Sequence, residues 1–127
     1  MDPSKLPGGL QGRRVLVVED EYFIADDVAT ELVSVGAHVL GPVPDLPGAI
    51  EVIASGEPID VALLDINLQG ETVYPLADAL RERQVPFVFA TGYGQALIPE
   101  GYRDVPRWEK PHDHRELARM LPNLLNP

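Results

Sequence analysis

Apolar residues along the chain follow two patterns, short continuous runs and stripes with helical spacing. The continuous runs predict five strands, at Arg13–Val18, Ala37–Val43, Asp60–Leu64, Val85–Ala90 and Val105–Trp108. Runs without polar alternation are typical of parallel strands that are covered on both faces. The sequence therefore favours a parallel sheet between layers of helices.

Helical stripes separate these runs. Apolar residues three or four positions apart predict helices over Glu21–Val35, from Asp45 to a stop at Gly56, over Thr72–Arg83 and over His112–Leu125. The segment from Gly92 to Arg103 is different, because it holds three glycines and a proline and leaves only QALI as helix-forming sequence. We expect the fourth of five helices to be short, mobile or absent.

Repeated strand–helix units in a short chain predict an α/β domain with the flavodoxin-like, doubly wound order 2-1-3-4-5. Gly41-Pro42 interrupts the second run and indicates an edge strand. The first dozen residues are rich in proline and glycine, so we expect a flexible arm over 1–12 and one domain over 13–127.

Composition narrows the functional classes. The formal net charge of -10 argues against nucleic-acid binding and suits a metal site or a basic partner better. There is no cysteine, which excludes thiolate chemistry, and no apolar run approaches the length that spans a membrane. The N-terminus lacks the apolar region of a secretory signal, so a cytoplasmic location is expected.

Reactive residue types follow four of the predicted strands. Glu19-Asp20 follows the first strand, Asp65-Ile66-Asn67 the third, Thr91 the fourth and Lys110 the fifth. In the predicted strand order the first and third strands are neighbours, so their carboxylates share one crevice. Crowded carboxylates and room for water are typical of a Mg²⁺ site. A nearby lysine and hydroxyl would face an anion, which indicates phosphoryl transfer.

With these motifs the sequence resembles the receiver domain of response regulators. The resemblance rests on VLVVEDE at 15–21, DVALLDINL at 60–68, the threonine of FAT at 89–91 and Lys110-Pro111, and it covers about residues 13–125. It implies a Mg²⁺-dependent domain of a two-component signalling system. Such a domain is not an enzyme on other substrates, since it catalyses only its own phosphorylation and dephosphorylation.

The resemblance also implies the role of each site residue. Asp65 would accept the phosphoryl group from a histidine kinase or a histidine phosphotransfer protein. Asp20 would ligate Mg²⁺ together with Glu19, Asp65 and the backbone carbonyl of Asn67. The Thr91 hydroxyl and the Lys110 ammonium would contact the phosphoryl group. The family often has a cis peptide bond between the residues equivalent to Lys110 and Pro111.

The chain departs from most receivers in two ways. Arg107 stands three residues before the lysine, where a switch tyrosine or phenylalanine is usual, and a fourth helix is poorly encoded. Both features, with the run PFVFATGYG, resemble the FAT GUY subgroup of receivers. We therefore expect 92–103 to be mobile before phosphorylation and to become ordered when Thr91 moves toward a phosphoryl group.

Three functions remain open. The first is a receiver that signals by binding an unidentified downstream protein, or that serves as a phosphoryl relay or as a phosphoryl sink. The second is a receiver-shaped binding module that ignores phosphorylation, which the missing switch aromatic favours. The third is a toprim-type Mg²⁺ phosphoryl-transfer enzyme, against which stand Asn67 in place of an acid and the charge of the chain.

Overall fold

A computed structural model describes residues 9–92, 98–110 and 114–125. Its main sheet has five parallel strands in the order β2-β1-β3-β6-β7, which confirms the predicted flavodoxin-like order once the separate β4-β5 pair is set aside. The strands are β1 (Arg14–Val18), β2 (His38–Val43), β3 (Val61–Asp65), β6 (Phe87–Thr91) and β7 (Arg107–Glu109). A small antiparallel hairpin, β4 (Asn67–Leu68) with β5 (Glu71–Thr72), follows β3 and was not predicted.

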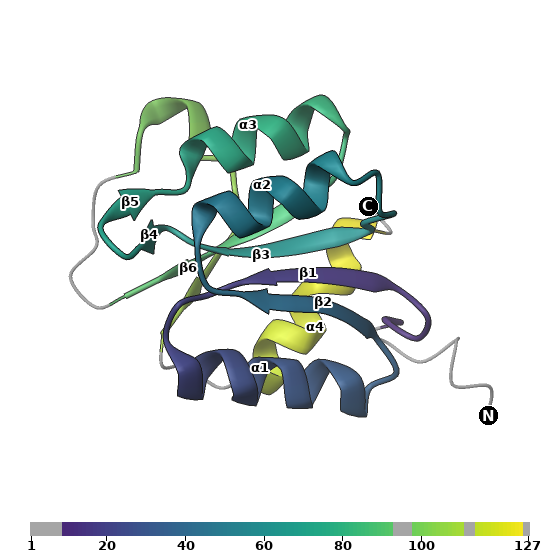
Figure 1. The fold of residues 1–127 in the computed structure, drawn as a ribbon. Helices are drawn as coiled ribbons and strands as arrows, with labels where there is room; N and C mark the ends of the chain where they lie inside the picture. The colour runs from purple at the N-terminus through teal and green to yellow at the C-terminus, as the bar shows by residue number, and fades with distance from the viewer. Residues whose placement is uncertain (1–8, 93–97, 111–113, 126–127) are drawn as a thin grey trace.

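Helices cover both faces of the sheet. Figure 1 shows α2 (Leu46–Ala54) and α3 (Tyr74–Glu82) on one side, with α1 (Tyr22–Ser34) and α4 (His114–Leu125) on the other. Successive residues of a strand point to opposite faces, so Leu16 packs in the core under α2 and α3, while Val17 packs in the core under α1 and α4. Two apolar cores therefore hold the sheet rigid between them.

Most apolar residues with helical spacing are buried against the sheet. Val73, Leu76 and Leu80 are fully buried at and after the start of α3, as their spacing predicts. The Asp45 side chain caps α2 by accepting a hydrogen bond from the Gly48 N–H at 2.8 Å. Two apolar residues that fit the helical spacing nevertheless face solvent, since Ile50 is 45% exposed and Val35 is 39% exposed.

The β2 strand lies at one edge of the sheet, as Gly41-Pro42 indicated. Gly41 has a φ of +97°, and a Cβ atom there would lie 2.6 Å from the Val43 nitrogen and 2.9 Å from the Val17 carbonyl oxygen. Only glycine fits this close approach between β1 and β2. The register between the two strands also shifts at this point, between Leu16 and Val18.

Residues 9–12, at the start of the described chain, pack against the domain. Residues 9–12 do not extend away from the domain: Leu10 is only 1% exposed within the core under α1 and α4, and the Gly12 N–H donates to the Gly36 carbonyl at 2.8 Å. Leu10 was included in the expected flexible arm because the surrounding residues are rich in proline and glycine. An arm can therefore comprise residues 1–8 at most, and these lie outside the described residues.

The segment after β6 is described in part. Within residues 98–110, Glu100–Tyr102 form a single 3-10 turn, and the last strand begins at Arg107, two residues later than predicted. Ile98 is buried in the core under α2 and α3. The expected mobility and phosphorylation-dependent ordering of residues 92–103 stay a prediction. Residues 93–97 of this segment lie outside the described residues, as does the peptide bond to Pro111.

Among the residues that the structure describes, no helix is long and apolar enough to span a membrane.

Candidate functional site

Three carboxylates meet at the carboxyl ends of β1 and β3. Glu19 and Asp20 follow β1 directly, and Asp65 is the last residue of β3. Because Val18 pairs with Leu64, the two strands end level with each other. One carboxylate oxygen from each of Glu19, Asp20 and Asp65 lies within 4.8 Å of the others. The structure thus brings together the acids that the sequence placed at neighbouring strand ends.

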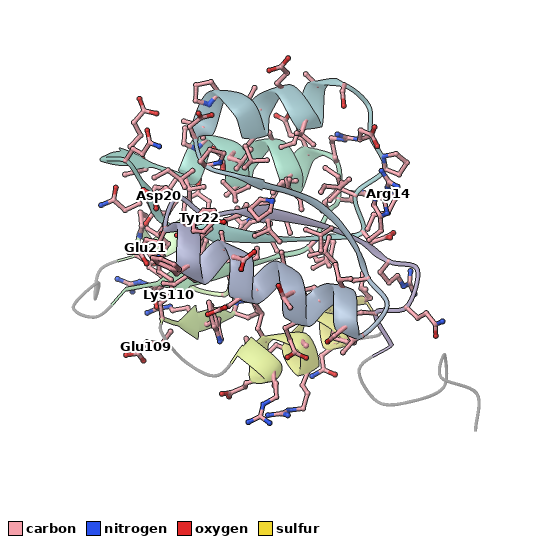
Figure 2. The ribbon with its side chains drawn as sticks, turned by 60° about the horizontal axis from the view of Figure 1, so that its bottom comes forward. Arg14, Asp20, Glu21, Tyr22, Glu109 and Lys110 are labelled. Atoms are coloured by element: carbon pink, nitrogen blue, oxygen red, sulfur yellow. The ribbon has the colours of Figure 1, made fainter. Side chains whose placement is uncertain are left out.

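Lys110 lies among these acids. Its Nζ atom is 3.1 and 3.3 Å from the two carboxylate oxygens of Glu19 and 3.3 Å from Asp65 Oδ2. Glu21 is a further partner, with Oε2 at 3.6 Å. Figure 2 shows Asp20, Glu21 and Lys110 beside the first residue of α1, whereas Arg14 lies at the opposite end of the sheet. The ammonium group is buried and bridges the two acidic strand ends.

Thr91 and Asn67 lie at the carboxyl ends of β6 and β3. Thr91 ends β6 and is buried, and its carbonyl accepts the Lys110 N–H at 2.7 Å, which ties the ends of β6 and β7 together. Asn67 is exposed, and its backbone N–H donates to Asp65 Oδ1 at 3.2 Å. All six predicted site residues therefore lie at the carboxyl ends of the strands.

Burial and crowding change the pKa values of the acids. Burial raises the pKa of Asp65 to about 8, and the hydrogen bond and negative charge of Glu19 add to this effect, while Lys110 opposes it. Burial would also raise the pKa of Asp20, but hydrogen bonds from Asp65 and from the Gln69 backbone lower it overall. The two acids are therefore shifted in opposite directions within one cluster.

The neighbouring carboxylates also shift the pKa of Lys110. Burial alone would lower the pKa of its ammonium group, but the carboxylates of Asp65 and Glu19 raise it above the ordinary value. The lysine is therefore firmly cationic. One ammonium group faces the three clustered carboxylates, so the cluster keeps an excess of negative charge.

The donor set fits Mg²⁺. Glu19, Asp20 and Asp65 offer only oxygen atoms, which hard divalent cations prefer. Asp20 and Asp65 border an open cavity of about 390 Å³, whose lining also includes Glu21, Asn67, Gln69 and Lys110.

Sequence reasoning missed two residues of this site. Glu21 contacts Lys110, and its place directly after Glu19-Asp20 was the available signal. The backbone N–H of Gln69 donates to Asp20 Oδ2 at 3.0 Å, from the tip of the β4-β5 hairpin. The sequence could not predict this second contact, because every residue except proline has a backbone N–H.

Tyr74, Phe89 and Tyr102 form an aromatic cluster near the 3-10 turn at Glu100–Tyr102. Arg107, at the position of the usual switch aromatic, is exposed, and the adjacent Trp108 is buried under α4. Tyr102 instead stacks on Tyr74 with ring centroids 4.8 Å apart, and its hydroxyl donates to Asp78 at 2.5 Å. The segment that follows residues 93–97 is thereby fastened to α3.

A five-stranded doubly wound sheet with an acidic cluster and a lysine at its strand ends defines a receiver-type α/β domain. No protein-family model matches the sequence. SdrG from Sphingomonas melonis Fr1, known from a solution structure, is 36% identical with a TM-score of 0.79, over 90% of this chain and 97% of SdrG. A further SdrG structure, described as the BeF3-activated conformation, has a TM-score of 0.73 over 88% and 95% of the two chains.

A response regulator receiver protein from Sinorhizobium medicae is 26% identical with a TM-score of 0.77, over 92% of this chain and 97% of that protein. The sensory transduction protein LytT of Bacillus subtilis is 28% identical over 112 residues, which are 85% of this chain and 46% of LytT. The chain thus spans about half the length of the curated relatives that it matches. It belongs to the response-regulator receiver family of two-component signalling.

Proposed function

We propose that this domain is a Mg²⁺-dependent receiver that accepts a phosphoryl group on Asp65. The observation that carries the proposal is the meeting of Glu19, Asp20 and Asp65 within 4.8 Å, with Lys110 Nζ at 3.3 Å from Asp65. Carboxylates for a cation, one of them also a nucleophile, and a fixed ammonium group are the parts that phosphoryl transfer uses. The receiver domain would begin near residue 9 and extend to the end of the chain.

In this proposal each residue has a defined task. A carboxylate oxygen of Asp65 attacks the phosphorus of a phosphohistidine, the P–N bond breaks, and the histidine ring leaves as an aspartyl phosphate forms. Mg²⁺, held by Glu19, Asp20, Asp65 and the Asn67 carbonyl, would neutralise the charge of the acids and of the incoming phosphoryl group. Hydrolysis by water later returns the Asp65 carboxylate and releases phosphate.

Lys110 and Thr91 would bind the transferred group. The Lys110 ammonium is already within 3.3 Å of Asp65 Oδ2, so it can pair with a phosphoryl oxygen after a small movement. Thr91 ends the adjacent strand β6 and supplies a hydroxyl donor. We assign this hydroxyl to a phosphoryl oxygen, and we assign the chain to the FAT GUY subgroup on its PFVFATGYG run.

The partners in this proposal are a histidine kinase or a histidine phosphotransfer protein and a downstream protein. Kinases of this type draw on cytoplasmic ATP, so the domain would act in the cytoplasm. The net charge of -10 makes a nucleic-acid partner unfavourable for this domain.

Phosphorylation by a small donor tests the proposal. Acetyl phosphate with Mg²⁺ is expected to add one phosphoryl group, detected by intact mass and lost on mild alkaline hydrolysis. Asp65→Ala should abolish the label, whereas the control Asp26→Ala, on the exposed face of α1, should keep it. A label that persists in Asp65→Ala refutes the assignment. A parent protein that binds Mg²⁺ but never takes the label would favour a phosphorylation-independent binding module.

A further inference from the structure

The β4-β5 hairpin is a tight turn beside the acidic cluster. Asn67 pairs with Thr72 and Leu68 with Glu71, which leaves Gln69 and Gly70 as its two turn residues. Their φ angles are +51° and +86°, the pattern of a type I′ hairpin turn. Leu68 is 1% exposed, and the Val73 N–H donates to the Ile66 carbonyl at 3.1 Å. The base of the hairpin is therefore anchored in the core.

The tip of this hairpin contacts two loops at the carboxyl edge of the sheet. The Gln69 backbone N–H donates to Asp20 Oδ2 at 3.0 Å, across 49 positions of sequence. The Gln69 side-chain amide donates to the Pro44 carbonyl at 3.3 Å. Gln69 thus links the residue after β1 to the loop after β2, and it adopts a left-handed backbone that residues other than glycine rarely adopt.

We propose that the Gln69–Gly70 turn is a positioning element for the cation, and that Gln69 orients the Asp20 carboxylate through its backbone N–H. The inference rests on the metal site of the proposed function. Asp20 is half-buried, and it is the acid of the cluster whose oxygen accepts this N–H, so the bond fixes the rotation of the carboxylate. Partners of metal ligands that fix their orientation contribute to affinity without touching the ion.

Gly70 offers a mild way to disturb the turn. A Cβ atom at Gly70 meets nothing within 4 Å, so Gly70→Ala introduces no clash, but its φ of +86° is strained for an L residue. Gly56 is a matched control, because it has a φ of +81°, equally open surroundings and a position just after α2, away from the carboxyl ends of the strands. Both variants carry a similar conformational penalty, and only one touches the turn.

The expected results separate positioning from general stability. Gly70→Ala should raise the Mg²⁺ Kd about tenfold, measured by Mg²⁺ titration in ¹H–¹⁵N NMR. Gly56→Ala should leave it unchanged, although both variants lower the metal-free Tm by a similar amount. The Gln69 amide proton should also shift upfield in metal-free Gly70→Ala, as it should in Asp20→Asn, because its carboxylate partner is disturbed.

A second variant removes the donor itself. Gln69→Pro has no backbone N–H, and because proline cannot adopt the φ of +51° at this position it also disrupts the turn. Its Tm reports whether the domain still folds. A folded Gln69→Pro and a Gly70→Ala that both bind Mg²⁺ as tightly as the parent overturn the inference, even if Asp65 is phosphorylated normally. A weakened Kd without any phosphorylation of the parent leaves the inference standing and refutes the proposed function. A parent that binds no Mg²⁺ overturns both.

Discussion

Lys110 donates to both carboxylate oxygens of Glu19, at 3.1 and 3.3 Å, although the two residues are 91 positions apart in the chain. Their side chains are 7% and 1% exposed, so this is a buried ion pair at the junction of β1 and β7, which are not adjacent strands. The ion pair connects the carboxyl end of β7 to the acidic carboxyl end of β1. It holds the Lys110 ammonium 3.3 Å from Asp65 Oδ2.

Removing the cation from this pair should destabilise the domain. Lys110→Met leaves Glu19 buried without its ammonium partner, and loss of one member of a buried pair costs about 3 to 5 kcal/mol of unfolding free energy. Urea unfolding at neutral pH measures this change. The control Glu57→Gln removes the exposed ion pair with Arg14 and should cost less than about 1 kcal/mol. Equal losses in the two variants would contradict the structural role of Lys110.

The raised pKa of Asp65 predicts an unusual pH dependence. Its folded pKa, about 8, lies above its ordinary value of 3.8, so its contribution to stability is full below about pH 4 and is lost as pH rises through 8. Asp65→Asn has no such titration. In EDTA, the Tm advantage of Asp65→Asn over the parent should therefore grow from pH 5.5 to pH 8.5, as checked by calorimetry. A constant difference across this range would contradict the shift.

Mg²⁺ should stabilise the parent by binding the folded state. At a free Mg²⁺ concentration of about 100 times Kd the expected gain is about 2.7 kcal/mol, since the unfolded chain lacks the site. Calorimetry with increasing MgCl₂ should show a rising Tm in the parent. Asp20→Asn, which removes one carboxylate of the cluster, should abolish most of the rise. A rise that is the same in both proteins would indicate nonspecific salt screening of the net charge.

Leu10 tests where the folded domain begins. It is 1% exposed within the core under α1 and α4, so Leu10→Ala should cost about 2 to 5 kcal/mol of unfolding free energy. Val33→Ala is the control, because Val33 is 59% exposed on α1 and its change should stay within about 0.5 kcal/mol. Urea unfolding compares the two. A negligible loss in Leu10→Ala would restore the boundary near residue 13.

Periodic patterns were sufficient for most of the architecture. Continuous apolar runs and helical stripes predicted the strands and helices, because both patterns depend on local residue type. The repeated strand–helix units then predicted the strand order, and Gly41-Pro42 indicated the edge position of β2. Helix margins were less certain: Ile50 and Val35 fit a stripe by spacing, yet they face solvent. Leu10 was missed for the complementary reason, since one apolar residue among glycines has no period.

The sequence by itself determined which chemical groups this protein brings to the carboxyl edge of its sheet. Glu19, Asp20, Asp65, Thr91 and Lys110 each follow a recognisable strand, and parallel topology forces such positions together. Only the tertiary structure decided how these groups are held. The Glu19–Lys110 pair and the Gln69 N–H on Asp20 join distant segments, and such contacts depend on packing and on a backbone donor that no residue pattern reveals.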